Sequence, residues 1–268
     1  MAFLPPLEDL VLSSDQIRDY ALNGHVLVKG VASPATLGQI GDPLWTSVRK
    51  VMETKDPQGR VENYGGMFQQ VTNVWRLDPV LREFIFSRRF AKIAADLMGV
   101  TGVRLYHDQA LFKPRGGKPT PWHQDQIYWP LDTERTITMW MPLVPVDDTT
   151  GTMSFVDGSH RTGSLLDAAI GMEADTFFEG WVKDGNRPVT SYALAPGDAT
   201  FHAGWTVHKA YPNTGDRMRE VITIIYYADG TRIMTPDSKY RQVDMEVFHP
   251  GQKPGDLAAS ELNPLLYP

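Results

Sequence analysis

The sequence predicts a mainly β protein with flanking helices. After Gly102, many short apolar segments alternate with Gly- and Pro-containing turns, which is typical of a β sandwich or barrel. Before Gly102 the apolar residues are spaced as in helices. The composition of the 268 residues, 42% hydrophobic and 22% charged, is ordinary for a globular protein. We expect a single domain, with a helical layer over about 1–100, a β core over about 101–230 and a tail over 231–268.

The N-terminal layer is predicted from caps and apolar spacing. Ser13 and Ser14 offer N-caps for a first helix, because their side-chain oxygens accept from free backbone amides. Gly99 ends the last helical block, since glycine adopts the left-handed conformation common after a helix. The expected elements are a helix ending at Asn23-Gly24, a strand over His25 to Lys29, a helix from Ser33-Pro34 to about Lys50–Lys55, and a helical block over about 78–98.

The β core is predicted from apolar runs that are separated by turn signals. The expected strands cover residues 103–113, 136–146, 152–156, 190–194, 199–201 and 219–227. Residues 161–188 interrupt this alternation of strands and turns and are expected to be partly helical. The tail after Gly230 has little periodicity. A long insert beside a site is often a lid. We therefore expect both segments to cover the mouth of a pocket, with Phe177, Phe178 and Trp181 either closing over an apolar substrate or packing in the core.

Composition excludes several classes of protein. The chain has no cysteine, so disulfides, thiolate metal sites and cysteine nucleophiles are excluded. The net charge is -6 and no basic patch stands out, so no nucleic-acid partner is expected. No secretory signal and no apolar run of transmembrane length is present, and we expect a cytoplasmic protein with no membrane partner. Phosphate-binding loops and serine-hydrolase motifs are also absent.

One short motif indicates metal chemistry. His123 and Asp125 are two residues apart, so on a strand both side chains would point to the same face. A third ligand must come from elsewhere, and His208 is the candidate. Two imidazoles and one carboxylate on one face of an octahedron leave three open positions, as in the non-heme iron(II) oxygenases. The motif His-x-Asp alone is weak, because a surface histidine beside a turn carboxylate explains it equally well.

Two choices remain open at this stage. His202 competes with His208 as the distal ligand, and is otherwise a pocket or core histidine. Arg219 follows His208 by 11 residues and opens an apolar strand, where a buried guanidinium needs an anionic partner. Arg217 is its alternative, because it lies two residues earlier and shares its face if the strand begins early.

The sequence resembles the phytanoyl-CoA dioxygenase family of iron(II)/2-oxoglutarate oxygenases over nearly the whole chain. The matching segments are Leu12 to Gln16 with Asn23 to Val28, Phe112-Lys113-Pro114 followed by Trp122 to Asp125, Gly151 to His160, Pro196 to Ala199, and His208, Pro212, Asn213 and Arg219. The chain departs from the family pattern at two positions. Asp157 replaces a usual proline away from the chemistry, and Ala210 replaces a frequent serine, which puts one hydrogen bond to the cosubstrate in question.

The resemblance implies the fold and the roles of the site residues. It implies a double-stranded β-helix, the cupin-like jelly roll, with helices packed outside. It assigns His123, Asp125 and His208 as iron ligands and Arg219 as the partner of the distal carboxylate of 2-oxoglutarate. It places two more residues in the cosubstrate pocket: Gln109, which shares a strand face with apolar residues, and Trp140, which is alternatively a plain core tryptophan.

The activity implied by the resemblance is the oxidation of a small, partly apolar metabolite, most commonly its hydroxylation. Fe(II), 2-oxoglutarate as cosubstrate and O2 are the expected cofactors, with succinate and CO2 as products. The carboxylate of Asp125 argues against halogenation, in which chloride takes its place. Desaturation, epimerisation, ring formation and a non-redox jelly-roll metal enzyme stay open as alternatives, and neither the substrate nor the oligomeric state follows from the sequence.

Overall fold

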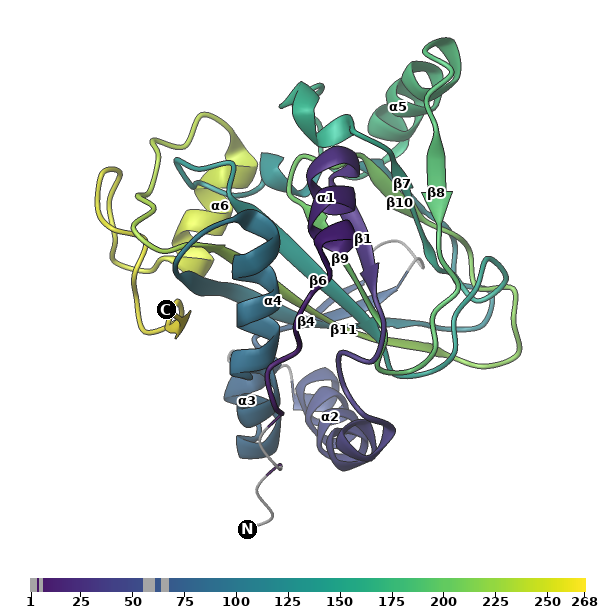
Figure 1. Ribbon diagram of the computed structural model, residues 1–268, viewed down its shortest axis with the longest axis vertical. Helices are drawn as coiled ribbons and strands as arrows, with labels where there is room; N and C mark the ends of the chain where they lie inside the picture. The colour runs from purple at the N-terminus through teal and green to yellow at the C-terminus, as the bar shows by residue number, and fades with distance from the viewer. Residues whose placement is uncertain (1–3, 5–6, 55–60, 64–67) are drawn as a thin grey trace.

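The computed structural model describes residues 4, 7–54, 61–63 and 68–268, which form two antiparallel sheets with helices outside them (Figure 1). The larger sheet has the order β1-β9-β6-β11-β4-β3-β2, with β12 also paired to β4, and the smaller has the order β5-β10-β7-β8. Two facing sheets with this interleaved order make the jelly roll that the sequence predicted. Among the described residues, no helix is both long and apolar enough to cross a membrane.

The N-terminal layer follows the predicted order of elements. Its elements are α1 (Ser14–Asn23), β1 (His25–Val28), α2 (Pro34–Thr54), β2 (Val61–Asn63), β3 (Gln69–Thr72), η1 (Val74–Arg76), α3 (Pro79–Ile85) and α4 (Arg88–Met98). Ser13 caps α1 in a reciprocal capping box with Gln16, and Gly24 ends the helix in the left-handed region. The expected continuation of the second helix to Lys55 lies outside the described residues, and strands β2 and β3 were not predicted.

The β core contains the remaining strands and two further helices. They are β4 (Val103–Lys113), β5 (Thr120–His123), η2 (Asp125–Ile127), β6 (Thr136–Pro142), β7 (Met153–Val156), η3 (Ser159–Thr162), α5 (Met172–Asp184), β8 (Val189–Ser191), β9 (Ala199–Ala203), β10 (His208–Ala210), β11 (Arg219–Ala228), α6 (Lys239–Phe248) and β12 (Leu265–Tyr267). A strand is found at each of the six predicted places. The strand expected over 136–146 already ends at Pro142, and the one expected over 190–194 covers only Val189–Ser191.

The structure corrects two expectations about helices. The block over 78–98 is two helices, because Ser87 has an extended ψ of 121° that breaks the helical ladder. The break lets both segments turn a ring inward, and Phe84 meets Phe90 edge-on with ring centroids 5.0 Å apart. The tail was expected to lack periodicity, yet it forms α6, whose N-cap Ser238 accepts a hydrogen bond from the amide of Arg241.

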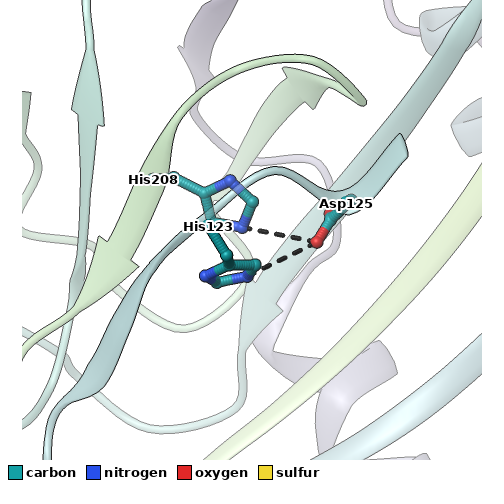
Figure 2. A group of neighbouring side chains, drawn as sticks. All are labelled: His123, Asp125 and His208. Carbon is teal, nitrogen blue, oxygen red and sulfur yellow. Dashed lines mark ion pairs between the residues drawn. The ribbon is translucent and has the colours of Figure 1, made fainter. Parts of the chain in front are cut away.

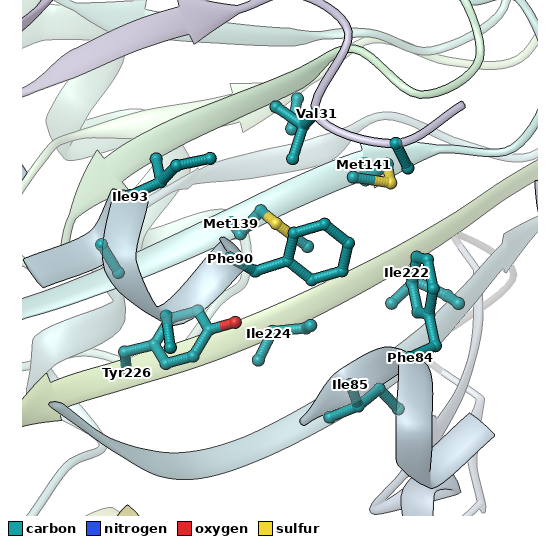
Figure 3. Packing of buried hydrophobic residues seen from close by; sticks show 14 of the residues in the cluster. Val31, Phe84, Ile85, Phe90, Ile93, Met139, Met141, Ile222, Ile224 and Tyr226 are labelled. Atoms are coloured by element: carbon teal, nitrogen blue, oxygen red, sulfur yellow. The ribbon is translucent and has the colours of Figure 1, made fainter. Parts of the chain in front are cut away.

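The main core lies between α4 and the outer face of the larger sheet (Figure 3). Phe90 and Ile93 on the helix pack over Met139 and Ile224 on β6 and β11, and all four side chains are fully buried. A second apolar cluster, which includes Trp140 and parts of β7 and β10, lies between the two sheets. The helices therefore cover one face of the larger sheet and leave its other face to the smaller sheet, where the candidate site lies.

The glycine after α1 gives a test of the packing. A Cβ on Gly24, which has a φ of +79°, would overlap the ring of His160 and the hydroxyl of Thr206. We expect Gly24→Ala to lower the free energy of unfolding by about 3 kcal/mol, because the alanine would adopt a strained left-handed conformation and would also overpack the site. Gly99 ends α4 with a φ of +65° and has open space around it. Gly99→Ala should therefore lower the free energy of unfolding by only about 1 kcal/mol. Urea unfolding followed by circular dichroism compares the two, and equal losses would refute the steric argument.

Candidate metal and cosubstrate site

Strand pairing brings the two predicted histidine ligands together. β10 pairs antiparallel with β5, and His208 lies directly opposite His123, with ring centroids 4.1 Å apart. Asp125 Oδ1 lies 3.5 Å from Nε2 of His123 and 3.6 Å from Nε2 of His208 (Figure 2). The three side chains could hold a metal ion, since their candidate ligand atoms all lie within 4.8 Å of one another.

The carboxylate reaches this cluster by a route that the sequence did not predict. β5 ends at His123, and Asp125 begins the 3-10 turn η2 rather than continuing the strand. The expectation that strand alternation puts both side chains on one face is therefore wrong. The turn itself redirects the chain and points the carboxylate back towards the histidines.

Hydrogen bonds orient both imidazoles. Nδ1 of His123 lies 2.7 Å from the carbonyl oxygen of Pro121, and Nδ1 of His208 lies 2.9 Å from that of Thr206. A carbonyl can only accept, so each Nδ1 carries the proton and each Nε2 presents a lone pair to the cluster. Backbone partners of this kind fix the orientation of metal-binding histidines.

The electrostatics of the cluster favour the forms that bind a cation. Burial acts to raise the pKa of Asp125, but His208, His123 and His202 together lower this pKa well below its usual range. Burial, assisted by His123, lowers the pKa of His208 well below its usual value. The carboxylate is therefore ionised and the imidazole neutral at neutral pH, as metal coordination requires.

His202 contacts the carboxylate and not the centre of the cluster. Its Nε2 lies 3.3 Å from Asp125 Oδ2, and Thr138 donates to the same oxygen at 3.3 Å. His202 is 1% exposed, and its Nδ1 has no hydrogen-bond partner among the described residues. The geometry thus separates the two oxygens of Asp125, with Oδ1 facing His123 and His208 and Oδ2 held by His202 and Thr138.

The cluster opens into a cavity of about 510 Å³ between the two sheets. Gln109, Thr223 and Trp140 face it from one row across β4, β11 and β6. The Thr223 hydroxyl donates to Gln109 Oε1 at 3.0 Å, which leaves the amide nitrogen of Gln109 available to a ligand. Both predicted cosubstrate residues therefore line the cavity, and Trp140, although 3% exposed, is not only a core residue.

Two buried cations are neighbours on β4 and β11, and one of them lines this cavity. Arg219 lines the cavity, is 2% exposed and donates to the carbonyl oxygen of Gly151 at 2.8 Å, while its Nε has no partner in the described part of the chain. Its guanidinium carbon lies 5.5 Å from the ring centroid of Trp140. Burial lowers the pKa of Arg219 to about 9. The alternative, Arg217, is exposed and lies before β11, where its Nε is 3.8 Å from Asp216 Oδ1.

The second cation, Lys113, was missed by the sequence analysis. It pairs with Arg219 across β4 and β11 and is 0% exposed. Burial, together with the nearby Arg219, lowers the pKa of Lys113 to about 7. No acidic partner of either cation is found in the part of the chain that the structure describes. A lysine within an apolar strand could have signalled this site, but only the pairing register places it beside Arg219.

Both segments that were expected to cover the pocket contribute residues to the lining of the cavity. Ile170 lines the cavity, and its amide donates to the Tyr128 hydroxyl at 2.8 Å. From the tail, α6 contributes Tyr240, whose ring meets that of Tyr128 edge-on at 5.7 Å. The further lining residues of the mouth are Trp129, Lys239, Val243, Asp244 and Phe248.

The aromatic residues of α5 do not reach the cavity. Phe178 is 2% exposed and packs with Trp122 behind β5, and Trp181 packs against the same cluster. Phe177 is 39% exposed. Core packing, the second of the two expectations, therefore describes Phe178 and Trp181. Asp175 of this helix accepts from the amide of Trp122 at 3.0 Å, so α5 braces the strand that carries His123.

Gln124, between the two candidate ligands, was also overlooked. It is 1% exposed, and its amide nitrogen donates to the carbonyl oxygens of Gly163 and Trp205 at 2.9 and 2.7 Å. Its carbonyl oxygen accepts from the amide of Leu165 at 3.1 Å. The base of the covering segment is therefore attached directly to the metal motif.

A jelly roll with two histidines and one carboxylate at facing strands is characteristic of the non-heme iron(II) oxygenases. The family model for phytanoyl-CoA dioxygenase matches residues 20–221 of the chain. The chain therefore belongs to this family of Fe(II)/2-oxoglutarate-dependent oxygenases.

Individual relatives carry different activities. A probable alpha-ketoglutarate-dependent hypophosphite dioxygenase of Stutzerimonas stutzeri is 25% identical over 67% of this chain and 60% of its own length. The chain spans 54% to 60% of the length of the curated relatives it matches. The non-heme alpha-ketoglutarate-dependent carbocyclase SnoK of nogalamycin biosynthesis is 26% identical with a TM-score of 0.77, covering 97% of this chain and 99% of its own.

A further solved structure shares the fold and contains ligands. The epimerase SnoN, in complex with Fe3+, alpha-ketoglutarate and nogalamycin RO, has a TM-score of 0.73 and 23% identity. The match covers 94% of this chain and 97% of that of the epimerase. At this level of identity the comparison supports the fold alone.

Proposed function

We propose that this protein is an Fe(II)/2-oxoglutarate-dependent oxygenase that oxidises a small, partly apolar metabolite, with hydroxylation as the reaction. One observation carries the proposal: the His123, Asp125 and His208 cluster shares a cavity with Arg219, a buried cation. The three residues can bind a metal cation and the arginine can bind an anion, so one cavity suits a metal and a carboxylate cosubstrate together.

In this proposal the metal is held by Nε2 of His123, Nε2 of His208 and Oδ1 of Asp125. The donor set fits Fe(II), because two neutral imidazoles and one carboxylate leave positions for a cosubstrate and O2. When bound, iron with 2-oxoglutarate and O2 would supply the oxidising power and release succinate and CO2. His202 and Thr138 keep the other oxygen of Asp125 hydrogen-bonded and so hold the carboxylate in place.

Arg219, Gln109 and Trp140 are proposed to bind 2-oxoglutarate. A guanidinium binds a carboxylate through two parallel hydrogen bonds, and burial strengthens them. The unpartnered Nε of Arg219 lies beside the Trp140 ring, which restricts where the guanidinium can move. The free amide nitrogen of Gln109 offers another donor to the same ligand.

The mouth of the cavity supports a small organic substrate. Rings from Tyr128, Trp129, Tyr240 and Phe248 provide apolar surface, and Asp244 and Lys239 add polar groups. The cavity volume, about 510 Å³, lies within the roughly 300–1,000 Å³ of small-molecule pockets. Ring formation is the second candidate reaction, because the carbocyclase matches nearly the whole chain at 26% identity.

Turnover of 2-oxoglutarate without substrate tests the proposal. The purified protein with Fe(II), 2-oxoglutarate and O2 should release succinate slowly, and a panel of candidate metabolites should accelerate this release. Product analysis by mass spectrometry then separates hydroxylation, which adds one oxygen atom, from ring formation, which removes two hydrogens. A protein that binds a divalent metal but never consumes 2-oxoglutarate would instead be a non-redox metal enzyme.

Metal binding distinguishes the two candidate distal histidines. His208→Ala should abolish binding of Mn(II), a probe for Fe(II), because it removes a ligand atom. His202→Ala should weaken binding only about tenfold to hundredfold, the usual effect of losing a residue that orients a ligand. Mn(II) electron paramagnetic resonance measures both, and circular dichroism confirms folding. The reverse order would make His202 the ligand.

Cosubstrate affinity distinguishes the two arginines. Arg219→Ala should raise the apparent 2-oxoglutarate constant about a hundredfold or more, since losing one partner of a buried charged pair costs about 3 to 5 kcal/mol. Arg217→Ala, at an exposed position, should change it less than about fivefold. The measurement is 2-oxoglutarate turnover at fixed Fe(II). Similar constants in the wild type and in Arg219→Ala would reject the assignment.

A further inference from the structure

One carboxylate of the cavity lining has no part in the proposed metal and cosubstrate chemistry. Asp244 on α6 lines the cavity, and apart from Asp125 it is the acidic residue of the lining in the described part of the chain. Tyr240, Asp244 and Phe248 follow one another at intervals of four residues along α6, so they lie along one side of the helix. All three line the cavity, so this side of α6 is turned towards it.

Aromatic rings lie before and after Asp244 along this side of the helix. The ring of Tyr240 meets that of Tyr128 edge-on at 5.7 Å, and the ring of Phe248 stacks on His107 of β4 with centroids 4.3 Å apart. These contacts with other elements restrict the two helix rings and leave the carboxylate between them. A carboxylate between two rings suits an organic cation, since the faces of aromatic rings carry partial negative charge.

A bulge in β4 orients this carboxylate. The residues on either side of Tyr106 pair with consecutive residues of β11, Ile225 and Tyr226, so Tyr106 is the extra residue of the ladder. Tyr106 is 0% exposed, and its hydroxyl donates to Asp244 Oδ2 at 2.9 Å. Burial, together with the nearby Asp244, raises the pKa of Tyr106 well above its usual value. The phenol is therefore a neutral donor, which holds the carboxylate in place without neutralising its charge.

The other charges of α6 favour a cation beside Asp244. The last turn of the helix contains no basic residue, and the C-terminal end of a helix carries partial negative charge. His249, which follows the helix, is buried, and burial lowers its pKa to about 4, so this imidazole is neutral. Lys239 lines the cavity from the first turn of α6, but it is exposed, and water and salt screen its charge. The other basic residues of the lining, Lys209 and Arg219, belong to β10 and β11.

We propose that the substrate carries an ammonium group, which pairs with the carboxylate of Asp244 and contacts the rings of Tyr240 and Phe248. The inference rests on the proposed function and deepens it, because it names the substrate class, a partly apolar amine. Hydrogen bonds between charged groups are stronger than neutral ones, and the faces of the rings attract the same cation. The rest of the amine would extend into the cavity towards the metal cluster.

The test compares three probes that share the phenylethyl group: phenethylamine, phenethyl alcohol and hydrocinnamate. Each is titrated calorimetrically into the protein loaded with Mn(II) and 2-oxoglutarate under nitrogen. The amine should bind about tenfold or more tightly than the alcohol, as expected for a hydrogen bond to a charged group, and the anionic hydrocinnamate should bind least. The same preference should appear in turnover, so metabolites that accelerate succinate release should carry an ammonium group.

A pair of variants on α6 isolates the carboxylate. Asp244→Asn keeps the shape and an oxygen that accepts from Tyr106, but removes the charge, so affinity for phenethylamine should fall about tenfold or more. Affinity for phenethyl alcohol should change less than about twofold. Glu246→Gln is the matched control, because it makes the same charge change on the same helix at an exposed residue outside the lining. It should bind phenethylamine within about twofold of the wild type, and circular dichroism confirms folding of both.

Two further sites separate the ring from the charge. Tyr240→Leu keeps an apolar side chain and should lower affinity for phenethylamine about threefold, the usual size of one exposed contact between a cation and a ring. Tyr240→Phe keeps the ring and should stay within about twofold of the wild type. Lys239→Gln removes a positive charge from the lining and should leave affinity for the amine unchanged or slightly higher.

The outcomes separate this inference from the proposed function. Binding of phenethyl alcohol or hydrocinnamate as tightly as phenethylamine would overturn the substrate class and leave the oxygenase intact. Equal effects of Asp244→Asn and Glu246→Gln would also overturn it, because they would report the general charge of the helix and not the cavity. A wild-type protein that neither binds nor consumes 2-oxoglutarate would reject the proposed function, whereas amine binding to the Mn(II)-loaded protein can be measured independently of turnover.

Discussion

The antiparallel pairing of β5 with β10 is the constraint on which the candidate site depends. It sets His208 opposite His123, which brings the two candidate histidine ligands together, and an irregularity in the pairing separates this pair from Ala210 and Thr120. A shift of one residue would turn these side chains to the other face of the sheet. The surroundings hold this register: α5 binds the amide of Trp122, and Gln124 binds the loops at Gly163 and Trp205.

The site also buries two positive charges on β4 and β11, which costs folding free energy. Lys113 and Arg219 are removed from water beside each other, which lowers the pKa of both. Backbone carbonyl oxygens, such as that of Gly151, compensate in part, since they satisfy donors without neutralising the charge. An anionic ligand would stabilise such a site, because it supplies the opposite charge that the buried cations lack. This feature is consistent with our proposal that Arg219 binds the carboxylate of the cosubstrate.

The segment that carries the candidate ligands His123 and Asp125 also has a structural part. Trp122 and Gln124 alternate with His123 and Asp125. Trp122 attaches the strand end to Asp175 of α5, and Gln124 attaches it to the loop at Gly163. Asp157, which stands where related sequences usually have proline, also has a structural partner. Its carboxylate lies 2.9 Å from Nε2 of His25 and ties β1 to the turn after β7. The departure from the family pattern thus creates a part-buried hydrogen bond outside the cavity, and burial lowers the pKa of His25 in this contact.

Local apolar periodicity by itself predicted helices followed by many short strands, because neighbouring residues carry that information. The resemblance to a known family added the jelly-roll fold and the grouping of His123, Asp125 and His208. Gln109 and Trp140 also lie at the cavity where the family resemblance placed them. Only the tertiary structure decided that Arg219 and not Arg217 is buried, that His202 contacts Asp125 from the side, and that α6 forms part of the mouth. Burial and strand register depend on residues far apart in the chain, so neither can be read from local spacing. Lys113 shows the same limit, since only its pairing with Arg219 on the neighbouring strand reveals two adjacent buried cations.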